Sequence, residues 1–331
     1  MFVDIEAAGC SNTCRHCSAD GHLPYGDFFT LDELRTLKKE WGPLTIRFEP
    51  TAFTHFPEVM DESISLEHGG WLVTNGFGLA RREDFPTIFE QLAKTGIHTI
   101  AFTLHGLKAH HDWFVCRAGA FDDIVLATQR AKDFGFQPNW QIYVDHLGAK
   151  DIPALVEMAE QACGGPPQIA IPYHRVGGRL KHYEKLRPTL SDITQLGLDK
   201  LVDDPTRNYI AEPESLTAAD WLERWHESPD SDGFKHPFEP KTWPPAPTQP
   251  TLSIRIQRNR KVYLDPMVAA PILLGHLSAG RDKLLKRLAS LEPPNHIDLA
   301  PQDVHLSPDE QERLHPVGFS VRYAAISNRR K

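Results

Sequence analysis

Short apolar runs alternate along the first 190 residues with longer segments in which apolar positions recur every three or four residues. The short runs are bounded by glycine, proline or polar residues, which is typical of buried strands. Six strands are predicted, at 2–5, 44–48, 71–74, 98–103, 140–144 and 168–171. Strands that alternate with helices in this way predict a parallel sheet whose crossovers are right-handed.

The segments between these strands carry helical signals at their ends. Thr30 and Glu33 have the spacing of a capping box, in which each side chain bonds a free backbone amide of the other residue. Gly96 follows an apolar stripe and predicts a helix C-terminus, while Pro153 predicts a first helical turn. A weaker helix is expected at 58–67. The pattern predicts an α/β fold, either a doubly wound sheet or a curved partial barrel, with chemistry in the loops after the strands.

The pattern changes after about residue 190. Helices are predicted at 191–203 and 218–227, and prolines crowd the segment 237–250, which indicates an extended connector. A β-hairpin is predicted at 251–264 and a helix at 281–291. The basic end of the chain, from residue 322, is expected to be a solvated tail.

Composition narrows the classes of function. The chain has 331 residues, 40% hydrophobic and 24% charged, which is ordinary for a globular protein. Its formal net charge is −8, and an acidic chain is a poor general binder of nucleic-acid backbones. No apolar stretch is long enough to span a membrane, and the acidic N-terminus lacks the features of a signal peptide. We therefore expect a cytoplasmic protein whose thiols stay reduced.

Three of the five cysteines stand directly after the first predicted strand. Cys10, Cys14 and Cys17 have the spacing C-x3-C-x2-C. Three thiolates on one short loop can hold three irons of a [4Fe-4S] cluster and leave the fourth iron without a protein ligand. An open coordination position is what a metal site needs for chemistry on a bound molecule.

Two other interpretations of these cysteines stay open. With His16 or His22 the thiols can form a zinc site, although structural zinc usually takes ligands from two separated pairs and no second pair exists. Alternatively, Cys14 and Cys17 form a redox dithiol, which leaves Cys10 without a role.

The segment 9–17 resembles the cysteine motif of the radical S-adenosylmethionine (SAM) enzymes, with His16 just before the third cysteine, where the family has an aromatic or similar residue. The resemblance implies a partial (β/α)6 barrel and a [4Fe-4S] cluster whose fourth iron is chelated by SAM. It also implies one-electron cleavage of SAM to a 5′-deoxyadenosyl radical that abstracts hydrogen from the substrate. A flavodoxin or ferredoxin-type reductant is implied as the partner that supplies the electron.

Other segments resemble the SAM-binding elements of the same family. Residues 47–50 stand in place of its Gly-Gly-Glu-Pro, with both glycines replaced, so a different turn is expected there. Residues 73–76 resemble a Thr-Asn-Gly element near the SAM ribose, and 103–106 resemble a Ser-Leu-Asp-Gly element. The resemblance implies that SAM is contacted by His16, Phe48, Glu49, Thr74, Asn75, Thr103, Gln141 and Val176.

The loop 111–122 resembles the frame of family members that carry SPASM or twitch C-terminal domains, and 261–277 resembles those domains weakly. Asp265 stands where that subgroup has a cysteine, and the remaining Cys116 and Cys163 fall within the barrel. We therefore expect a small α+β, twitch-like domain that binds no metal. The chain then divides into three parts. Residues 1–190 form a radical SAM partial barrel, residues 191–250 a helical and proline-rich connector, and residues 251–331 the twitch-like domain.

Without auxiliary clusters, a redox-neutral reaction such as epimerisation or rearrangement is favoured. Cys116 is a candidate hydrogen donor, or a small residue that packs its loop. Tyr173 and His174, beyond the sixth strand, are further candidate catalytic residues at the substrate entrance. Three histidines are expected on surface loops without a metal: His105, His110 and His111.

Two functions follow from these observations. The first is a radical SAM enzyme that acts on a small specialised metabolite or a short peptide. The alternative is an iron–sulfur or zinc-binding scaffold or regulator without SAM chemistry, which the missing glycines at positions 47 and 48 suggest.

Overall fold

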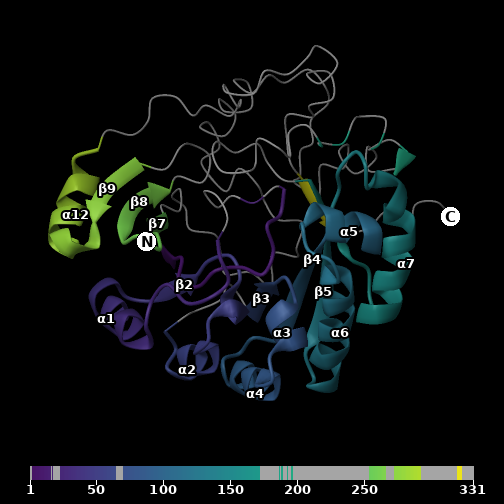
Figure 1. Ribbon diagram of the computed structural model, residues 1–331, viewed down its shortest axis with the longest axis horizontal. Helices are drawn as coiled ribbons and strands as arrows, with labels where there is room; N and C mark the ends of the chain where they lie inside the picture. Colours follow the sequence, from purple (N-terminus) through teal and green to yellow (C-terminus); the bar gives the residue numbers. More distant parts are fainter. Residues whose placement is uncertain are drawn as a thin grey trace, which may run out of the picture.

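The computed structural model shows strands and helices alternating along the chain (Figure 1). It describes residues 2–15, 17, 23–64, 70–171, 186, 188, 192, 195, 196, 253–265, 272–291 and 319–322. Within those residues, β1 to β5 are each followed by at least one helix, and no helix is long and apolar enough to cross a membrane.

The described elements fall into two stretches of the chain. The first comprises β1 (Phe2–Ile5), α1 (Leu31–Trp41), β2 (Leu44–Ile46), η1 (Pro50–Ala52), α2 (Phe56–Asp61), β3 (Trp71–Thr74), α3 (Phe77–Arg81), α4 (Phe85–Lys94), β4 (Thr99–Leu104), α5 (Lys108–Phe114), α6 (Ala120–Asp133), β5 (Gln137–Tyr143), η3 (Ala149–Asp151), α7 (Ile152–Cys163) and β6 (Gln168–Ile171). The second comprises β7 (Ser253–Ile256), β8 (Lys261–Asp265), β9 (Ile272–His276), η4 (Leu277–Ala279), α12 (Arg281–Ala289) and β10 (Phe319–Arg322).

The strands form two sheets, in the orders β2-β1-β7-β8-β9 and β10-β6-β5-β4-β3. Strand β1 is parallel to both of its neighbours, and β3 to β6 are parallel to one another. Strand β10 is the edge strand of the second sheet and pairs with β6 in antiparallel orientation. The predicted α/β fold with parallel strands is confirmed. Among the described pairings none joins β2 to β3, so the barrel strands divide into two sheets at that point.

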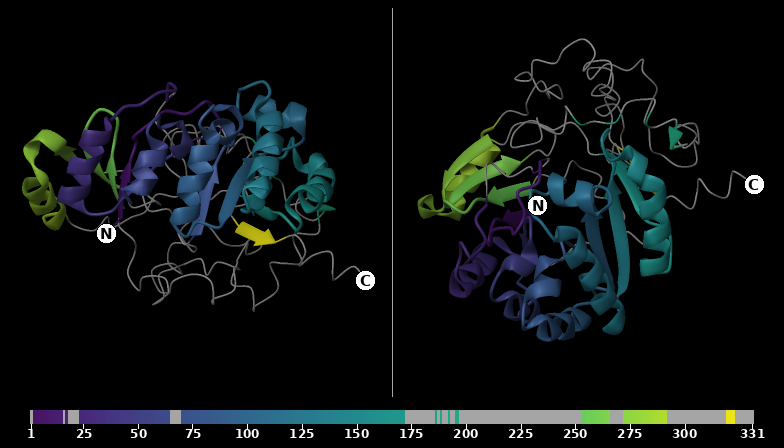
Figure 2. Two further views of the ribbon diagram at one scale, coloured as in Figure 1. Left: turned by 90° about the horizontal axis from the view of Figure 1, so that it is seen from below. Right: turned by 45° about the vertical axis from the view of Figure 1, so that its right-hand side comes forward.

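Helices cover one side of the strands. Figures 1 and 2 show α1, α2, α4, α6 and α7 along the outer side of an arc of strands, with β7 to β9 and α12 extending the arc next to β1. Alternate strand residues face these helices and are buried, as Phe102 of β4 and Trp140 of β5 illustrate. The intervening strand residues, among them Asn139 and Gln141, lie on the opposite, inner face.

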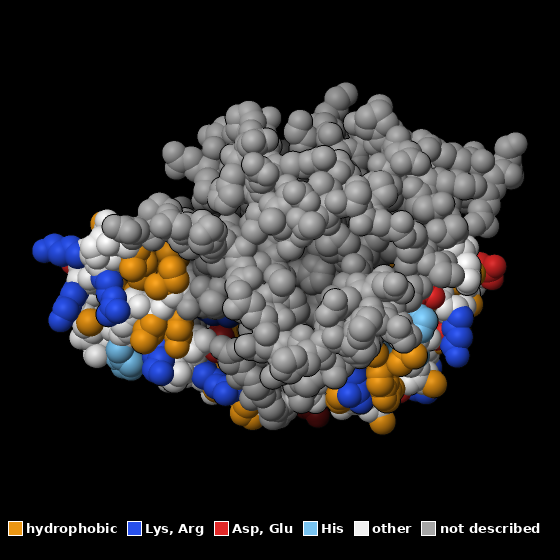
Figure 3. Space-filling model, turned by 90° about the horizontal axis from the view of Figure 1, so that it is seen from above, with side chains coloured by type: hydrophobic (Ala, Val, Ile, Leu, Met, Phe, Trp, Pro, Cys, Tyr) orange, Lys and Arg blue, Asp and Glu red, His pale blue; other side chains and the backbone are white. Residues whose placement is uncertain are grey.

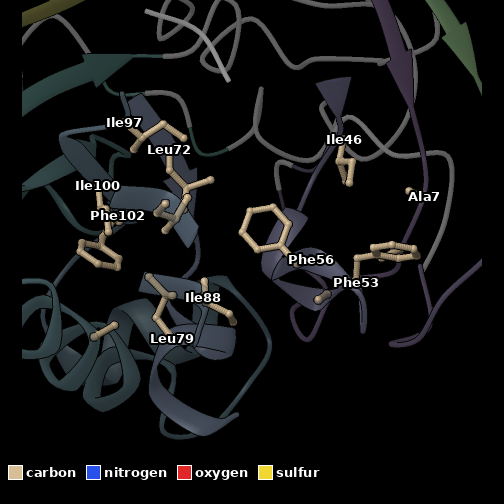
Figure 4. Close-up of a cluster of buried hydrophobic side chains, with 14 of the residues drawn as sticks. Ala7, Ile46, Phe53, Phe56, Leu72, Leu79, Ile88, Ile97, Ile100 and Phe102 are labelled. Carbon is tan, nitrogen blue, oxygen red and sulfur yellow. The ribbon is translucent and has the colours of Figure 1, made fainter. Parts of the chain in front are cut away.

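The core has two visible groups of apolar side chains. In Figure 4, one group consists of Leu72, Leu79, Ile88, Ile97, Ile100 and Phe102, and the other consists of Ala7, Ile46 and Phe53. Phe56 of α2 lies between them, and all of these side chains belong to one buried cluster. Apolar packing therefore continues across the gap between β2 and β3, where the described residues form no ladder of hydrogen bonds.

Several local predictions can be compared with the structure. The capping box of α1 is confirmed, because Thr30 Oγ1 accepts from Glu33 N at 3.2 Å and Glu33 Oε2 accepts from Thr30 N at 2.8 Å. The hairpin at β7 and β8 is also confirmed. The helix expected at 58–67 is wrong in its bounds, because α2 starts at Phe56 with Pro57 in its first turn.

Strands β9 and β10 are absent from the sequence prediction. Each forms by pairing with a strand that precedes it in the chain, β8 and β6 respectively. The helices predicted at 191–203 and 218–227, and the proline-rich segment, lie outside the described residues except for 192, 195 and 196.

Candidate functional site

The cysteine loop, defined as residues 9–17, begins four residues after β1. Gly9 is required at its start, because a Cβ atom there would lie 1.6 Å from the carbonyl oxygen of Pro24. Gly9 N donates to Gly26 O at 2.8 Å, and Cys17 N donates to Cys14 O at 3.2 Å. The loop therefore turns sharply and brings its three cysteines together at the end of a buried parallel strand.

The three thiols are half-buried and close enough for the charges of Cys10 and Cys17 to act on Cys14. Burial, with the nearby carboxylate of Glu49, raises the pKa of the Cys10 thiol to about 12. Burial, with the charges of Cys10 and Cys17, also raises the pKa of Cys14. Thiolates so placed require positive charge beside them, and bound metal ions supply it. The residues present fit an iron–sulfur cluster in this respect.

The arrangement of possible ligands bears on the kind of metal centre. Within the described ranges, no three His, Cys, Asp or Glu side chains are placed to hold one metal ion. A zinc ion needs its ligands converged on a single point, whereas each cysteine of a [4Fe-4S] cluster binds a different iron. His16 and His22, the other proposed zinc ligands, lie outside the described residues.

Asn75, directly after β3, binds the first cysteine. Its Nδ2 atom donates to Cys10 Sγ at 3.3 Å and to Ser11 Oγ at 3.1 Å. The backbone amide of Asn12 donates to the same sulfur at 3.4 Å. The sulfur of Cys10 thus receives two N–H···S hydrogen bonds, one from its own loop and one from the neighbouring strand end.

Glu49 joins the ends of β2 and β3. Its buried carboxylate accepts from Thr74 Oγ1 at 2.7 Å, from Asn75 N at 2.6 Å and from Thr51 N at 3.2 Å, and it also bonds Thr51 Oγ1. Burial raises the pKa of Glu49, and these hydrogen bonds oppose the rise. The carboxylate therefore connects the two sheets by side-chain bonds next to the cysteine loop.

Phe48, which precedes Glu49, has a φ of +71°, the left-handed region that glycine adopts most readily. The resemblance places the second glycine of Gly-Gly-Glu-Pro at this position. The backbone at Phe48 therefore has the conformation that a glycine at this position would adopt readily. For phenylalanine, which has a Cβ atom, this conformation is strained.

The segment after α5 packs against the cysteine loop through backbone hydrogen bonds. Thr13 N donates to Val115 O and Arg15 N to Phe114 O, both at 3.0 Å. Arg15 also lies over the exposed ring of Trp113, with 4.1 Å between the guanidinium carbon and the ring centroid. This segment covers the second half of the cysteine loop.

Arg117 adds a side-chain clamp that sequence reasoning missed. Its Nε donates to Asn12 Oδ1 at 2.6 Å, and its Nη1 contacts Asp123 Oδ2 at 2.5 Å. Asp123 is fully buried and also accepts from Arg81 Nε at 2.5 Å. Arg117 and Asn12 are 105 residues apart, so no local sequence pattern indicates this clamp.

Cys116 lies beside the cysteine loop. It is exposed and has a φ of +56°, and its Sγ atom is 4.0 Å from Phe114 O, the same carbonyl that accepts from Arg15 N. Its charge is among the influences that raise the pKa of Cys14. The hydrogen-donor role stays a prediction.

Thr103 and Gln141 share the inner face of the second sheet. The strand registers place Thr103, Gln141 and Gln168 in one row, where Gln141 Nε2 donates to Gln168 Oε1 at 2.9 Å. Val73, on the same face one row away, is 45% exposed although it lies within a parallel strand. Strand β3 is at the edge of this sheet, so the exposed Val73 lies at the border of its inner face.

The inner face of the first sheet carries charges that sequence reasoning also missed. Asp4, on β1, is buried and bonds Arg47 Nη2 at 2.5 Å, and the register places Arg255 of β7 beside it. Glu6 is also buried and accepts from Arg258 N at 3.2 Å. The alternation of Asp4, Ile5 and Glu6 in the sequence is the signal that could have identified this polar face.

Two of the three histidines expected on surface loops are buried, so that expectation is wrong for them. His105 stacks on Phe114 with 3.9 Å between ring centroids, and its backbone amide donates to His111 Nδ1 at 3.3 Å. Burial lowers the pKa of His111 to about 4. His110 is half-buried and contacts Asp145 at 2.8 Å.

Four predicted site residues, His16, Tyr173, His174 and Val176, lie outside the described residues. The structure brings together Cys10, Cys14, Cys17, Glu49, Thr74 and Asn75, and it places Thr103 and Gln141 on the inner face of the second sheet. On the face shown in Figure 3, described Lys and Arg side chains are interspersed with hydrophobic, acidic and histidine side chains. The described part of that face therefore has no uniformly basic surface.

Comparisons with known proteins find similarity to solved structures. No family model matches the sequence, and no curated protein sequence matches it. Similar solved structures include SuiB from Streptococcus suis, at 15% identity and a TM-score of 0.44. That alignment covers 79% of this chain and 59% of SuiB, so the chain spans less than two thirds of the length of SuiB.

Two structures of anSMEcpe are also similar. Native anSMEcpe with bound AdoMet has 15% identity and a TM-score of 0.46, and the alignment covers 86% of this chain and 80% of anSMEcpe. Native anSMEcpe with bound AdoMet and Cp18Cys peptide has 16% identity and a TM-score of 0.45, with coverages of 88% and 80%. At these values the similarity carries no argument about the site.

Proposed function

We propose that this chain is a radical SAM enzyme in which Cys10, Cys14 and Cys17 hold a [4Fe-4S] cluster and SAM binds at the fourth iron. The cluster, when bound, supplies the electron that cleaves SAM to methionine and a 5′-deoxyadenosyl radical, which abstracts hydrogen from the substrate. The observation that carries the proposal is the crowding of three half-buried thiols on one short loop at the end of β1.

The residues around the loop hold the thiols in place. Glu49 fixes the backbone of Asn75, and Asn75 in turn bonds Cys10. On the other side, Arg117 bonds Asn12 and the buried Asp123. A loop held from both sides presents its sulfurs in one geometry before the cluster binds, which reduces the conformational cost of assembly.

SAM and substrate are proposed to bind along the inner face of the second sheet. Thr103 and Gln141 supply a hydroxyl and an amide there, next to the exposed Val73. Amide and hydroxyl groups suit the polar functions of a small specialised metabolite or a short peptide. The AdoMet and peptide in the anSMEcpe structures belong to those proteins, and the proposal rests on the residues of this chain.

The outcome of the reaction is proposed to be redox-neutral, an epimerisation or a rearrangement, with a flavodoxin or ferredoxin-type protein as reductant. The support is the small number of cysteines outside the cysteine loop, which are Cys116 and Cys163. Cys163 is buried at the end of α7, whereas Cys116 is exposed and is proposed to return a hydrogen atom to the substrate radical. The S–H bond breaks as the substrate C–H bond forms, and the resulting Cys116 thiyl radical regains its thiol by taking one electron from the flavodoxin or ferredoxin-type reductant and one proton from solvent. Cys116→Ala should then stop product formation and leave SAM cleavage intact.

The direct test is anaerobic reconstitution with iron and sulfide, followed by SAM and dithionite, with 5′-deoxyadenosine as the measured product. The wild-type protein is expected to form 5′-deoxyadenosine, and Cys17→Ala is expected to form none. A cluster-loaded protein that forms no 5′-deoxyadenosine would favour the scaffold or regulator. A protein that holds zinc at these thiols would exclude the proposed chemistry.

A further inference from the structure

The sulfur of Cys10 is distinguished by its hydrogen bonds. It accepts from Asn75 Nδ2 at 3.3 Å and from Asn12 N at 3.4 Å. The two donors differ in kind, because Asn12 N is part of the cysteine loop itself, whereas the Asn75 amide arrives from β3, 65 residues away. Only the Asn75 bond can be removed by a side-chain substitution.

The orientation of the Asn75 amide is fixed by its neighbours. Its Oδ1 atom accepts from Phe77 N at 2.9 Å, in the turn that leads into α3. Since a backbone N–H must face the oxygen, the Nδ2 group is the end that faces Cys10 and Ser11. The backbone amide of Asn75 is held by Glu49 at 2.6 Å. The donor is thus positioned by bonds at both its backbone and its side chain.

A donor so placed affects a cluster bound at Cys10. Hydrogen bonds to the sulfurs of an iron–sulfur cluster are one of the factors that set its reduction potential. An N–H dipole aimed at the sulfur stabilises the more negative, reduced state and therefore raises the potential. Glu49, whose carboxylate lies near enough to act on Cys10, works in the opposite direction. The potential then reflects a balance between an amide donor and a buried carboxylate.

We propose that Asn75 is a positioning residue that raises the reduction potential of the cluster through its N–H···S hydrogen bond to Cys10. This inference rests on the proposed function, because it requires the cluster. It gives Asn75 a role separate from the contact with the SAM ribose that the sequence resemblance implies. Both hydrogens of the side-chain amide are already directed at Cys10 and Ser11, so this role does not depend on bound SAM.

Asn75→Asp is the sharpest variant for a test. The substitution keeps an oxygen that can accept from Phe77 N, and it replaces the donor at Cys10 with an acceptor of the same size. The lost donor and the added negative charge both favour the oxidised cluster, and a tenfold change in the equilibrium constant of a one-electron couple corresponds to about 59 mV. We expect the midpoint potential to fall by at least that amount.

Asn259→Asp provides a matched control. Asn259 Oδ1 accepts from Lys261 N at 3.1 Å, the same two-residue turn that Asn75 makes with Phe77, and the side chain is exposed in the β7–β8 turn. The control therefore adds the same charge and keeps the same local hydrogen bond at an exposed position, where solvent and salt screen the charge. Its midpoint potential should equal that of the wild type.

The measurement is an EPR-monitored redox titration of the reconstituted proteins without SAM. Asn75→Ala, which removes the donor without adding charge, should shift the potential in the same direction by a smaller amount. This variant is measured in place of Asn75→Asp if Asn75→Asp loses its cluster. Potentials equal to that of the wild type in the cluster-bearing Asn75 variants would overturn this inference alone. A wild-type protein that assembles no cluster would overturn it together with the proposed function.

Discussion

The cysteine loop and the helix-covered face of the second sheet are stabilised by different interactions. On that face, side chains such as Phe102 and Trp140 are buried among apolar neighbours from α3, α4 and α6. The cysteine loop instead is held by hydrogen bonds from Asn75 and Arg117, which reach it from other elements. Apolar packing is roughly proportional to area and tolerates small shifts, whereas hydrogen bonds fix direction. Substitutions should therefore separate assembly of the site from stability of the fold.

The largest expected effect is the loss of the metal centre in Cys14→Ala. Removal of one of three thiolate ligands leaves an iron without a protein ligand, so the reconstituted variant should contain little iron while its circular dichroism spectrum stays that of a folded protein. Iron analysis and absorbance measure the effect. Cys163→Ala is the matched control, because Cys163 is buried on α7 away from the loop, and it should retain its iron.

Phe102→Ala should have the opposite effect, because it should lower the stability of the fold and leave the metal centre unchanged. The Phe102 side chain on β4 is fully buried, so its truncation should lower the free energy of unfolding by about 3–5 kcal/mol. Urea denaturation measures the loss. The fraction that remains folded should still bind iron with the wild-type spectrum. A changed cluster spectrum in that fraction would show that the core and the site are not separable.

A pH effect is expected from His111. Its folded-state pKa of about 4 lies below the ordinary value of 6.5, so the unfolded chain binds more protons between these two values. Stability should therefore be constant above about pH 6.5 and fall as the pH approaches 4, by about 3 kcal/mol from this residue. His111→Gln keeps an acceptor for His105 N and should flatten this dependence in urea denaturation, whereas His98→Gln, at an exposed site, should not.

A smaller effect is expected from Arg117→Lys. Arg117 bonds Asn12 through Nε and Asp123 through Nη1, whereas lysine carries all its donors on one nitrogen and cannot occupy both positions. The free energy of unfolding should therefore fall by about 2 kcal/mol, and a chelator should remove iron faster than from the wild type. Arg130→Lys is the comparison, because Arg130 bonds the Leu79 and Ala80 carbonyls away from the loop. Equal rates of iron loss in both variants would contradict the clamp.

Local sequence patterns were sufficient for the strands β1 to β8 and for the position of the cysteine loop, but not for β9, β10 or the bounds of α2. The capping box at Thr30 and the hairpin at β7 and β8 depend on residues close in the chain, and both are present. The parallel pairing of β1 with β7 could not be predicted, because about 250 residues separate Phe2 from Ser253 and many strands have similar apolar patterns. Strand pairing between distant segments depends on packing of the whole chain.

The same distinction applies to the site. The spacing of Cys10, Cys14 and Cys17 identifies the loop, but the partners that hold it come from far along the chain. Asn12 and Arg117 are 105 residues apart, and their bond depends on how α5 packs against the loop. The burial of His105 and His111 was missed for a related reason, since a histidine in a loop sequence gives no sign of the aromatic ring, here Phe114, that covers it.

EPR spectroscopy of the anaerobically reconstituted, dithionite-reduced protein, with and without SAM, shows directly whether the cysteine loop holds a cluster to which SAM binds. We expect about four irons per chain, the signal of a reduced [4Fe-4S] cluster and a change in that signal when SAM is added. Zinc in place of iron at Cys10, Cys14 and Cys17, or a cluster signal that SAM leaves unchanged, would contradict this expectation.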